Sequence, residues 1–570
     1  MLNSSLNSCL NSNFSFEIDQ ACFSVVNYCS YRVILYLIAE EAYTGNGVPV
    51  ATLNPHKNKN LVISTKYPLH LYFQTDEPEQ TYDHCHTGYT FKEHGKYGWK
   101  LSDICNSIYV IHEPTENHLT IFTAFMIYIL LAILWTLSKV IVQVIRRKLS
   151  PNNVHDDWDR LQEAESSTQP VMRITKFSTR IRSVDTFRGI SILLMIFVNN
   201  GGGQYVFFHH SAWFGLSVAD LVLPWFAWIM GLTITISKRA ELRVTTLRYK
   251  IILRCLRRSV ILILLGLMLN SKSSKSLNDL RFPGVLQLLA ISYFVCTTLE
   301  IIFMKPYSQD TLLQFGRFGM YRDILDSWPQ WLIMIGIVTT HTLITFLLPV
   351  PNCPTGYFGP GGKYHYRGKY RNCTAGAAGY IDRLIFGNHT YNKTNNFIYD
   401  QISRYDPEGL MNTVSAIFIV YLGVHAGKIL LLYYQCNSRV IRWSLWAVVT
   451  GIIAGILCNF RTEGGVIPVS KNMMTLSYVL TCSSFAFLLY ALLYVLIDYK
   501  QFWSGAPFTY AGINPIFLYV GDYLMKGLFP WKWNIAHPSH ALLLAMNLWT
   551  TTLWAIIAYL LYRKDIIITV

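Results

Sequence analysis

Residues 182–236 read RSVDTFRGISILLMIFVNNGGGQYVFFHHSAWFGLSVADLVLPWFAWIMGLTITI. Two apolar runs lie in this stretch, and a loop of glycines, aromatics and two histidines joins them. A helix needs about 20 apolar residues to cross the hydrocarbon core of a bilayer, and both runs approach that length. The three glycines after Asn200 tolerate positive φ angles, so the chain can reverse tightly there. The stretch therefore predicts two membrane helices joined by a compact turn.

The whole chain has the composition of a membrane protein. Among its 570 residues, 52% are hydrophobic and 14% are charged, whereas about 25% are charged in soluble domains. This composition excludes a disordered chain, a collagen-like fibre and a small disulfide scaffold. The net charge of +15 would suggest nucleic-acid binding in a soluble protein. Here the basic residues flank apolar runs, which indicates membrane topology and no nucleic-acid partner.

Eleven apolar runs predict a polytopic α-helical protein that crosses the lipid bilayer about eleven times. The run at 184–199 is short and contains Asp185 and Arg188, so its signal is the weakest. The runs lie at 119–145, 184–199, 217–236, 251–269, 284–304, 328–348, 412–432, 441–458, 473–497, 508–527 and 541–562.

The distribution of basic residues predicts the orientation. If residues 1–118 lie outside the cytosol, the segments assigned to the cytosol are richer in Lys and Arg than the opposite loops. The N-terminus is then luminal and the C-terminus cytosolic. We expect a luminal domain at 1–118, a first transmembrane helix at 119–145, a cytosolic linker at 146–182 and a ten-helix membrane domain at 183–570. The last includes a long luminal loop at 349–411.

The segments assigned to the lumen have features of an oxidising, glycosylating compartment. Residues alternate as in strands at 61–73 and 106–112, which predicts a small β-rich luminal domain. We expect disulfides between Cys85 and Cys105 and between Cys353 and Cys373, although spacing leaves other connectivities open. Glycosylation sequons begin at Asn3, Asn13, Asn372, Asn388 and Asn392.

The loop at 200–216 is the candidate active-site floor. His209, His210 and Trp213 follow the glycines, and Asp220 opens the next apolar run. The alternative is an interfacial loop whose aromatic residues anchor at the depth of the lipid headgroups. The sequence contains no Walker A loop, no Rossmann fingerprint, no HExxH and no metal-ligand spacing that predicts a metal site.

Several motifs resemble the heparan-α-glucosaminide N-acetyltransferase family of lysosomal membrane enzymes. VDTFRGISILLMIFVN is followed by the GGG turn, the His210-x-x-Trp213 pair and ADLVLPWFAWIMG, in the family's order. The resemblance covers nearly all of 180–563. Further matching motifs are FPGVLQLLAISY at 282–293, CPTGYFGPGG at 353–362, NCTAGAAGYIDR at 372–383, DPEGLMNTVSAIFIVYLGVHAGKIL at 406–430, VSKNMMTLSYVL at 469–480 and GINPIFLYVG at 512–521.

The resemblance implies a lysosomal membrane homodimer that moves acetyl from cytosolic acetyl-CoA to the amine of a terminal, non-reducing α-glucosamine of heparan sulfate. The family's catalytic histidine corresponds to His210, and its partner asparagine corresponds to Asn199. The chain departs from the family pattern at Asn200, where an aromatic is expected, at His209, where a lysine is usual, and at His425, which replaces a glutamine.

Acetyl transfer to an amine suits these two residue types. A histidine, with an ordinary pKa near 6.5, exists in both protonation states near neutral and mildly acidic pH. It can act as the general base or can carry the acetyl group itself. An asparagine can fix the imidazole tautomer or donate to the developing oxyanion.

A basic cluster is the expected site for the phosphates of acetyl-CoA. Arg254, Arg257 and Arg258 share one face of a predicted helix, and Arg239 precedes them. The alternative is that these arginines only snorkel to the membrane surface.

Three further residues are candidates for the acceptor site. We expect Asp220 to orient His210 or the sugar, with a helix cap as the alternative. Trp213 and Glu463 are expected to bind the sugar. The Glu463 carboxylate is expected to bind the ammonium group of the glucosamine. Alternative functions are acyl transfer to another acceptor, transport, and a catalytically inactive scaffold.

Overall fold

A computed structural model describes most of the chain. The sequons at Asn3, Asn13 and Asn392, the residue Glu463 and nearly all of the expected linker lie outside the described residues. The chain forms two units, one comprising 1–115 with 182–570 and the other comprising 116–181. The described residues are 9, 16–39, 47–75, 84–102, 104–115, 118–149, 181–244, 247–272, 274, 276–304, 321–362, 369–391, 404–462 and 464–568.

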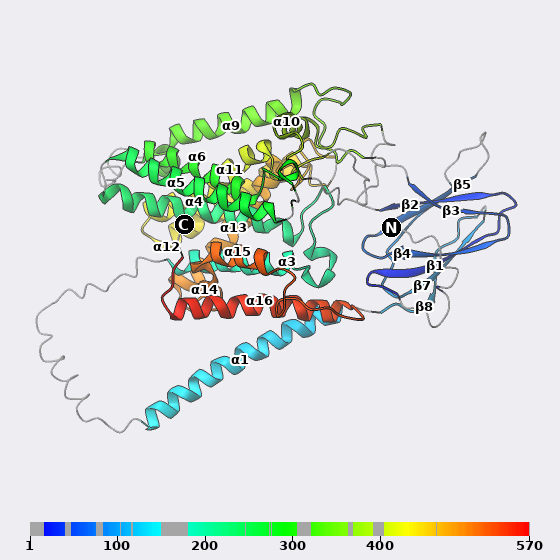
Figure 1. Ribbon diagram of the computed structural model, residues 1–570, viewed down its shortest axis with the longest axis horizontal. Helices are drawn as coiled ribbons and strands as arrows, with labels where there is room; N and C mark the ends of the chain where they lie inside the picture. The colour runs from blue at the N-terminus through cyan, green and yellow to red at the C-terminus, as the bar shows by residue number, and fades with distance from the viewer. Residues whose placement is uncertain are drawn as a thin grey trace, which may run out of the picture. The chain divides into compact units, whose positions relative to one another are not determined.

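The N-terminal domain consists of two four-stranded β-sheets, which confirms the predicted β-rich class (Figure 1). Their strand orders are β4-β1-β7-β8 and β3-β2-β5-β6. The stretch at 61–73 crosses two strands, because a turn ending at Pro68 separates β4 from β5. The strands are β1 (Gln20–Asn27), β2 (Val33–Ala39), β3 (Val48–Leu53), β4 (Asn58–Ser64), β5 (Leu69–Thr75), β6 (His84–Tyr89), β7 (Lys96–Leu101) and β8 (Tyr109–His112).

Large side chains from both sheets form the core of this domain. Phe23 of β1 and Trp99 of β7 stack with ring centroids 6.4 Å apart, and Phe73 of β5 meets Trp99 edge-on at 6.0 Å. All three side chains are buried. Because successive strand residues point to opposite faces, every second residue of these strands can reach the shared core.

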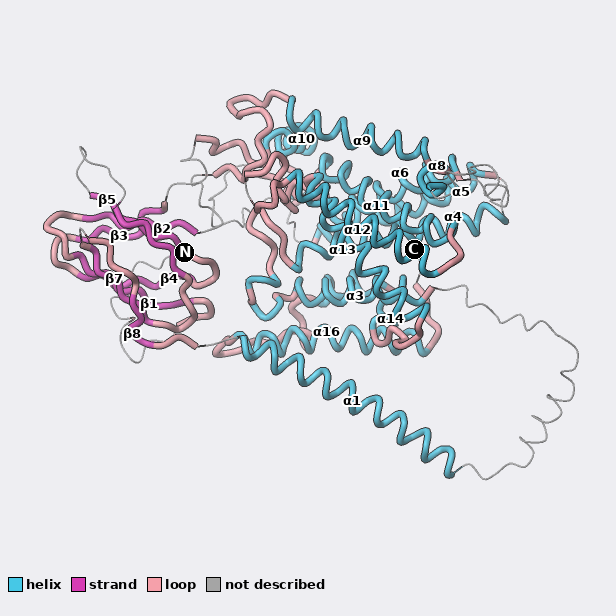
Figure 2. Tube along the Cα trace, turned by 180° about the vertical axis from the view of Figure 1, so that it is seen from behind, coloured by secondary structure: helices cyan, strands magenta, loops and turns pink. Residues whose placement is uncertain are grey.

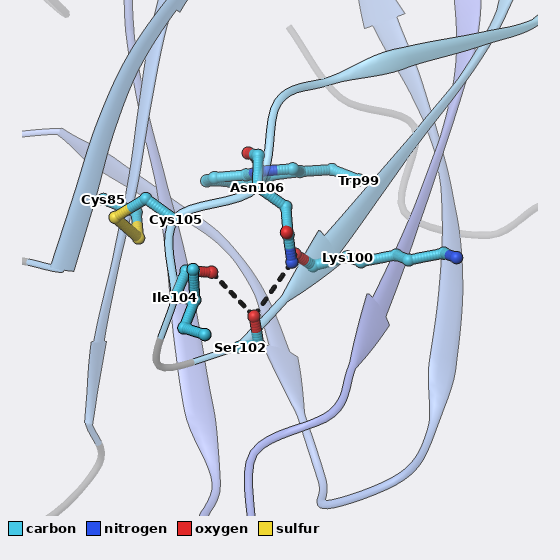
Figure 3. Close-up of a disulfide and its surroundings, with 7 residues drawn as sticks. All are labelled: Cys85, Trp99, Lys100, Ser102, Ile104, Cys105 and Asn106. Atoms are coloured by element: carbon cyan, nitrogen blue, oxygen red, sulfur yellow. Dashed lines mark hydrogen bonds between the residues drawn. A yellow bond between two sulfur atoms is a disulfide. The ribbon is translucent and has the colours of Figure 1, made fainter.

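A disulfide joins the two sheets beside this core (Figure 3). Cys85 lies in β6, and Cys105 lies in the loop between β7 and β8. The loop is held in place because Trp99 Nε1 donates to the Asn106 carbonyl at 2.8 Å, while Asn106 Nδ2 donates to Ser102 Oγ at 2.9 Å. Both expected disulfides are confirmed, at Cys85–Cys105 and Cys353–Cys373, and a third, Cys9–Cys22, was not predicted.

Eight helices in the described part of the chain are long and apolar enough to cross a membrane, so a multi-pass membrane protein is confirmed. The count of eleven spans stays a prediction. The runs at 184–199 and 251–269 are helical, as α3 (Arg182–Asn199) and α5 (Arg248–Ser271), but both contain several charged residues. The eight are α1 (His118–Leu149), α4 (Val218–Val244), α6 (Val285–Phe303), α9 (Trp328–Leu347), α11 (Leu410–Leu432), α12 (Cys436–Leu457), α13 (Leu476–Leu493) with its continuation to Tyr499, and α16 (His540–Arg563).

The run at 508–527 is not one continuous helix. It is divided into α14 (Phe508–Ile513) and α15 (Pro515–Met525), with Asn514 between them outside helical geometry. A proline disfavours helical geometry at the residue before it, which explains the break before Pro515. Helices α3, α14 and α16 lie side by side in both views (Figures 1 and 2).

Glycines allow α4 and α11 to pack with their backbones in contact. A Cβ on Gly423 of α11 would lie 1.8 Å from the Trp228 carbonyl oxygen, and a Cβ on Gly231 of α4 would lie 1.8 Å from the Val420 carbonyl oxygen. Gly427, four residues after Gly423, faces α4 in the same way. This is the close packing that small residues permit between membrane helices.

We expect Gly423→Ala to destabilise the protein by about 1–3 kcal/mol or more, because the added methyl must push two helix backbones apart. Thermal unfolding in detergent measures the loss. Gly336→Ala in α9 is the matched control, since a Cβ there meets nothing within 4 Å. Equal unfolding temperatures for the two variants would contradict the close contact.

A short helix outside the spans, α10 (Gly376–Phe386), carries a buried carboxyl group. Asp382 is 1% exposed, and its Oδ1 accepts the Leu410 N–H at 2.9 Å at the start of α11. Burial raises the pKa of the Asp382 carboxyl from its ordinary 3.8 to about 7. The folded protein therefore keeps this carboxyl protonated at pH values where the unfolded chain would ionise it.

This shift predicts that acidic conditions stabilise the fold. Between about pH 4 and pH 7 the folded state binds more protons than the unfolded state, so the free energy of unfolding decreases as the pH rises, by about 1.4 kcal/mol per pH unit from this one group. We expect Asp382→Asn, which keeps the acceptor oxygen, to reduce the difference in melting temperature between pH 5 and pH 7.5. An unchanged difference would exclude Asp382 as its source.

Candidate active site

The loop between α3 and α4 begins with a turn that requires glycine. Gly201, Gly202 and Gly203 have φ angles of 116°, 54° and 70°. A Cβ on Gly202 would lie 2.6 Å from the Cβ of Phe208, so a larger residue would collide with the loop. The turn reverses the chain, and the second half of the loop reaches the first turn of α4.

His540, the first residue of α16, holds this turn against the β domain. Its Nδ1 lies 2.9 Å from the Gly203 carbonyl oxygen, and its Nε2 lies 3.2 Å from Asp19 Oδ1 and 3.4 Å from Glu93 Oε2. Carbonyl and carboxylate oxygens only accept hydrogen bonds. With both carboxylates ionised, both ring nitrogens are therefore satisfied together only in the imidazolium form of His540.

His210 and Asp220 form a hydrogen-bonded pair at the end of the loop. The two atoms His210 Nδ1 and Asp220 Oδ1 are 2.8 Å apart. The His210 side chain is 48% exposed, whereas the Asp220 side chain is fully buried. A buried carboxylate that accepts Nδ1–H leaves the Nε2 lone pair of the imidazole available, which is the tautomer that a general base requires.

The surroundings of Asp220 keep its carboxylate in one orientation. Its Oδ2 accepts both the backbone N–H and the hydroxyl of Ser211, at 3.2 and 2.9 Å, and both the backbone N–H and the hydroxyl of Ser217, at 3.1 and 2.9 Å. Tyr478 of α13 donates to the Asp220 carbonyl at 2.6 Å. Four donors to Oδ2 favour the ionised carboxylate and direct Oδ1 toward His210.

Lys471 completes this cluster from a loop far along the chain. Its Nζ lies 2.9 Å from His210 Nδ1 and 3.7 Å from Asp220 Oδ1. Burial lowers the pKa of the Lys471 ammonium, while Asp220 and Glu408 oppose that shift. Nδ1 has either a proton or a lone pair, so it can donate to Asp220 or accept from Lys471, but it cannot do both.

A cavity of about 520 Å³ opens beside His210. Along α4 its lining extends from Ala219 to Lys238, a distance of about 28 Å at 1.5 Å per residue. This is close to the thickness of the hydrocarbon core, about 30 Å. The polar residues near one end are His210, Asn199, Lys471 and Glu408, and those farther along are Arg188, Lys238 and Arg258.

Two similar proteins show the family of the chain. The Homo sapiens protein named heparan-alpha-glucosaminide N-acetyltransferase is 39% identical over 512 residues, which cover 85% of this chain and 77% of that protein. The chain belongs to the heparan-α-glucosaminide N-acetyltransferase family. The Mus musculus protein of the same name is 35% identical over an alignment of 588 residues, which covers 97% of this chain and 89% of that protein. No family model matches the chain. Membership in this acetyltransferase family makes the chain an acyltransferase.

Asn199, the expected partner of His210, lines the same cavity. Asn199 is the last residue of α3 and lines the same cavity as His210, without a hydrogen bond between the two described side chains. Lys526 donates to the Asn199 carbonyl at 2.9 Å. Asn200, the next residue, donates to Asp522 Oδ1 at 3.0 Å. The end of α15 therefore positions the end of α3.

Of the four arginines expected to bind the donor, the structure places Arg258 on the cavity wall. Its guanidinium lies 4.9 Å from the centre of the Tyr293 ring. Arg254 pairs with Glu241, and Arg239 donates to the Leu431 carbonyl at 3.3 Å. Arg239, Arg254 and Arg257 are not among the residues that line the cavity. The spacing of Arg254, Arg257 and Arg258 puts all three on one helix face. It does not show that only Arg258 on that face reaches the cavity.

Trp213, expected to bind the sugar, is a buried residue behind the loop. Its ring is 2% exposed, donates to the Phe358 carbonyl at 2.8 Å, and contacts the ring of Tyr405 at 5.9 Å. Trp213 does not line the cavity. Its contacts with Phe358 and Tyr405 hold the loop in place on the side away from the cavity. Glu463, the other expected sugar ligand, lies outside the described residues.

Sequence reasoning missed two polar residues of the cavity wall, Lys471 and Glu408. Both lie in segments that resemble the acetyltransferase family, VSKNMMTLSYVL and DPEGLMNTVSAIFIVYLGVHAGKIL. The only sequence signal that could have indicated Lys471 and Glu408 is a charged residue next to an apolar run. That signal alone resembles the many charged residues that end membrane helices, so it does not single out a site.

Proposed function

We propose that the protein transfers acetyl from acetyl-CoA to the amine of a terminal, non-reducing α-glucosamine of heparan sulfate. The observation that carries this proposal is the His210–Asp220 pair at one end of a cavity that extends about 28 Å along α4. The names of the human and mouse relatives support the acceptor. The dyad supports an acyl transfer that needs a base.

In this mechanism the Asp220 carboxylate holds His210 with its Nε2 lone pair toward the cavity. Nε2 removes one proton from the acceptor ammonium, and the resulting amine attacks the thioester carbonyl. The C–S bond breaks, a second N–H proton passes to the leaving thiolate, and the products are the amide and free CoA. Asn199, at the same end of the cavity, is proposed to orient the imidazole or to donate to the developing oxyanion.

The same dyad would also support a covalent route in which His210 first takes the acetyl group. One measurement separates the two routes. Mixing the protein with labelled acetyl-CoA in the absence of acceptor releases stoichiometric CoA and labels the protein only on the covalent route. Direct transfer releases CoA only when the acceptor is present.

The donor is proposed to enter from the end of the cavity opposite His210. Lys238 and Arg258 lie at that end, and their positive charges suit the phosphates of acetyl-CoA. Lys238 pairs with Glu241 at 2.7 Å, which keeps its ammonium beside the cavity. The long pantetheine arm would then bring the thioester to His210 through the cavity.

We place this reaction in the lysosomal membrane, with a luminal N-terminus, a cytosolic C-terminus and a homodimeric assembly. The disulfides Cys85–Cys105 and Cys353–Cys373 support an oxidising compartment for the β domain and the 349–411 loop. The donor would then come from the cytosol, and the acceptor would be processed in the lumen.

The test is acetyl transfer from labelled acetyl-CoA to glucosamine by the purified full-length protein. Labelled N-acetylglucosamine is the expected product. Uptake of CoA or sugar into vesicles without an acetylated product would instead favour a transporter. Transfer to another amine in a panel of amino sugars and lipids, but not to glucosamine, would indicate an acyltransferase for a different acceptor.

A further inference from the structure

Glu408 is an acidic residue on the wall of the same cavity as His210, and the mechanism above does not use it. It lies just before α11, and its side chain is 14% exposed. Lys471, which contacts His210, lines the cavity as well. Glu408 therefore shares one cavity wall with the two residues at the reacting end, His210 and Lys471.

Glu408 shares one guanidinium with a second carboxylate. Arg281 pairs with both Asp406 and Glu408, and its Nε donates to Asp406 Oδ2 at 2.7 Å. Asp406 is fully buried and also accepts the backbone N–H groups of Tyr391 at 3.1 Å and Glu408 at 3.0 Å. Asp406 is therefore the structural partner of Arg281, whereas Glu408 is the carboxylate of the two whose residue also lines the cavity.

The ion-paired groups at this end of the cavity have an excess of negative charge. The carboxylates in these ion pairs are Asp220, Asp406 and Glu408, and the cations paired with them, apart from His210, are Arg281 and Lys471. With a neutral imidazole, three negative charges face two positive ones. Burial also raises the pKa of the Glu408 carboxyl, because little water is present to solvate the anion. A cationic ligand would supply both the missing charge and the missing solvation.

We propose that Glu408 binds the ammonium group of the acceptor amino sugar and holds it beside His210. This inference rests on the proposed function and names the residue that selects the acceptor. An amino sugar in acid carries its nitrogen as an ammonium, which a carboxylate recognises by charge and by hydrogen bonds. Glu408 thus takes the role that the sequence suggested for Glu463. A sugar with a hydroxyl or an acetamide in place of the ammonium would lose the charge attraction to Glu408.

The decisive variant is Glu408→Gln in the full-length protein. Its amide has nearly the same shape and can still accept a hydrogen bond from Arg281. We expect the KM for glucosamine to rise about 10- to 100-fold, the loss typical of a charged hydrogen bond. The KM for acetyl-CoA and the inhibition constant of N-acetylglucosamine, which has no ammonium, should stay within about threefold of wild type. Glu408→Asp, which retains the charge, should recover part of the affinity.

Two results would overturn the proposal. One is an unchanged KM for glucosamine in Glu408→Gln. The other is an equal loss of affinity for glucosamine and N-acetylglucosamine, which would indicate structural damage. Asp406→Asn is the structural comparison: it removes the other partner of Arg281 and should lower the melting temperature without changing the preference for glucosamine over N-acetylglucosamine.

A binding measurement separates failure of this proposal from failure of the proposed function. If wild-type protein transfers no acetyl group, glucosamine binding is measured directly by calorimetry on wild type and Glu408→Gln. Weaker binding in the variant would support Glu408 as an ammonium site even then. Equal binding, or no binding to either protein, would exclude it.

Discussion

Replacing His210 by alanine is expected to lower kcat for acetyl transfer by about 10²–10⁴-fold, the contribution typical of a positioned general base. The imidazole is the group at the reacting end of the cavity whose tautomer is set by a buried carboxylate, 2.8 Å from Nδ1. Alanine removes the base and leaves the cavity open. Labelled acetyl transfer at saturating donor and acceptor measures the effect.

His209→Ala is the matched control, because the two histidines are adjacent in the same loop. His209 does not line the cavity, and burial lowers the pKa of its imidazole. We expect this variant to keep kcat within a few-fold of wild type. Similar losses in both variants would mean that the loop, and not the His210 imidazole, supports activity. Full activity in His210→Ala would place the chemistry elsewhere, with Asn199 and Asp220 next to be tested.

Replacing Asp220 by asparagine should produce a loss of similar size, on the order of 10²–10⁴ in kcat, by a different route. The amide oxygen would take the place of Oδ2, which receives four donors from Ser211 and Ser217. The amide NH2 group would then face His210 Nδ1, as Lys471 already does. Two donors at Nδ1 move the imidazole proton to Nε2, so the ring can no longer accept a proton from the amine.

Kinetics and stability together test this account of Asp220. The melting temperature should fall only slightly, because the asparagine keeps the serine contacts, while kcat falls strongly. Asp279→Asn, a conservative change in a turn whose carboxylate bonds only to a neighbouring serine among the described residues, is the control and should leave kcat unchanged. Wild-type kcat in Asp220→Asn would exclude tautomer control by this carboxylate.

The correct predictions from sequence concern properties that are local in the chain. Membrane helices are recognised from hydropathy within about 20 consecutive residues, and the β-rich domain from alternation over short segments. The catalytic role of His210 and Asp220 stays a prediction, but their hydrogen-bonded pair also lies within one motif, because the two residues are only ten positions apart. The two disulfides predicted join cysteines twenty residues apart, whereas the Cys9–Cys22 bridge was missed because spacing does not fix connectivity.

The direction of a side chain is not visible in the sequence pattern. Arg254, Arg257 and Arg258 share a helix face by their spacing, but only Arg258 lines the cavity. Trp213 follows His210 by three residues and yet points into the core behind the loop. A sequence pattern predicts which residues share one face of a helix. Tertiary packing determines whether that face contacts the cavity, the core or the lipid.

By itself, the sequence determined that the chain crosses a membrane several times, that its first 118 residues are rich in β-structure, and that His210 is the central candidate for catalysis. Only the tertiary structure placed Lys471 against His210, across 261 positions of the chain, and Glu408 on the same cavity wall. Hydropathy and motifs depend only on residues that are close together in the sequence, so they predict helices and turns. A cavity is formed by helices that meet from distant parts of the chain, and its lining depends on which side chains those helices turn toward one another.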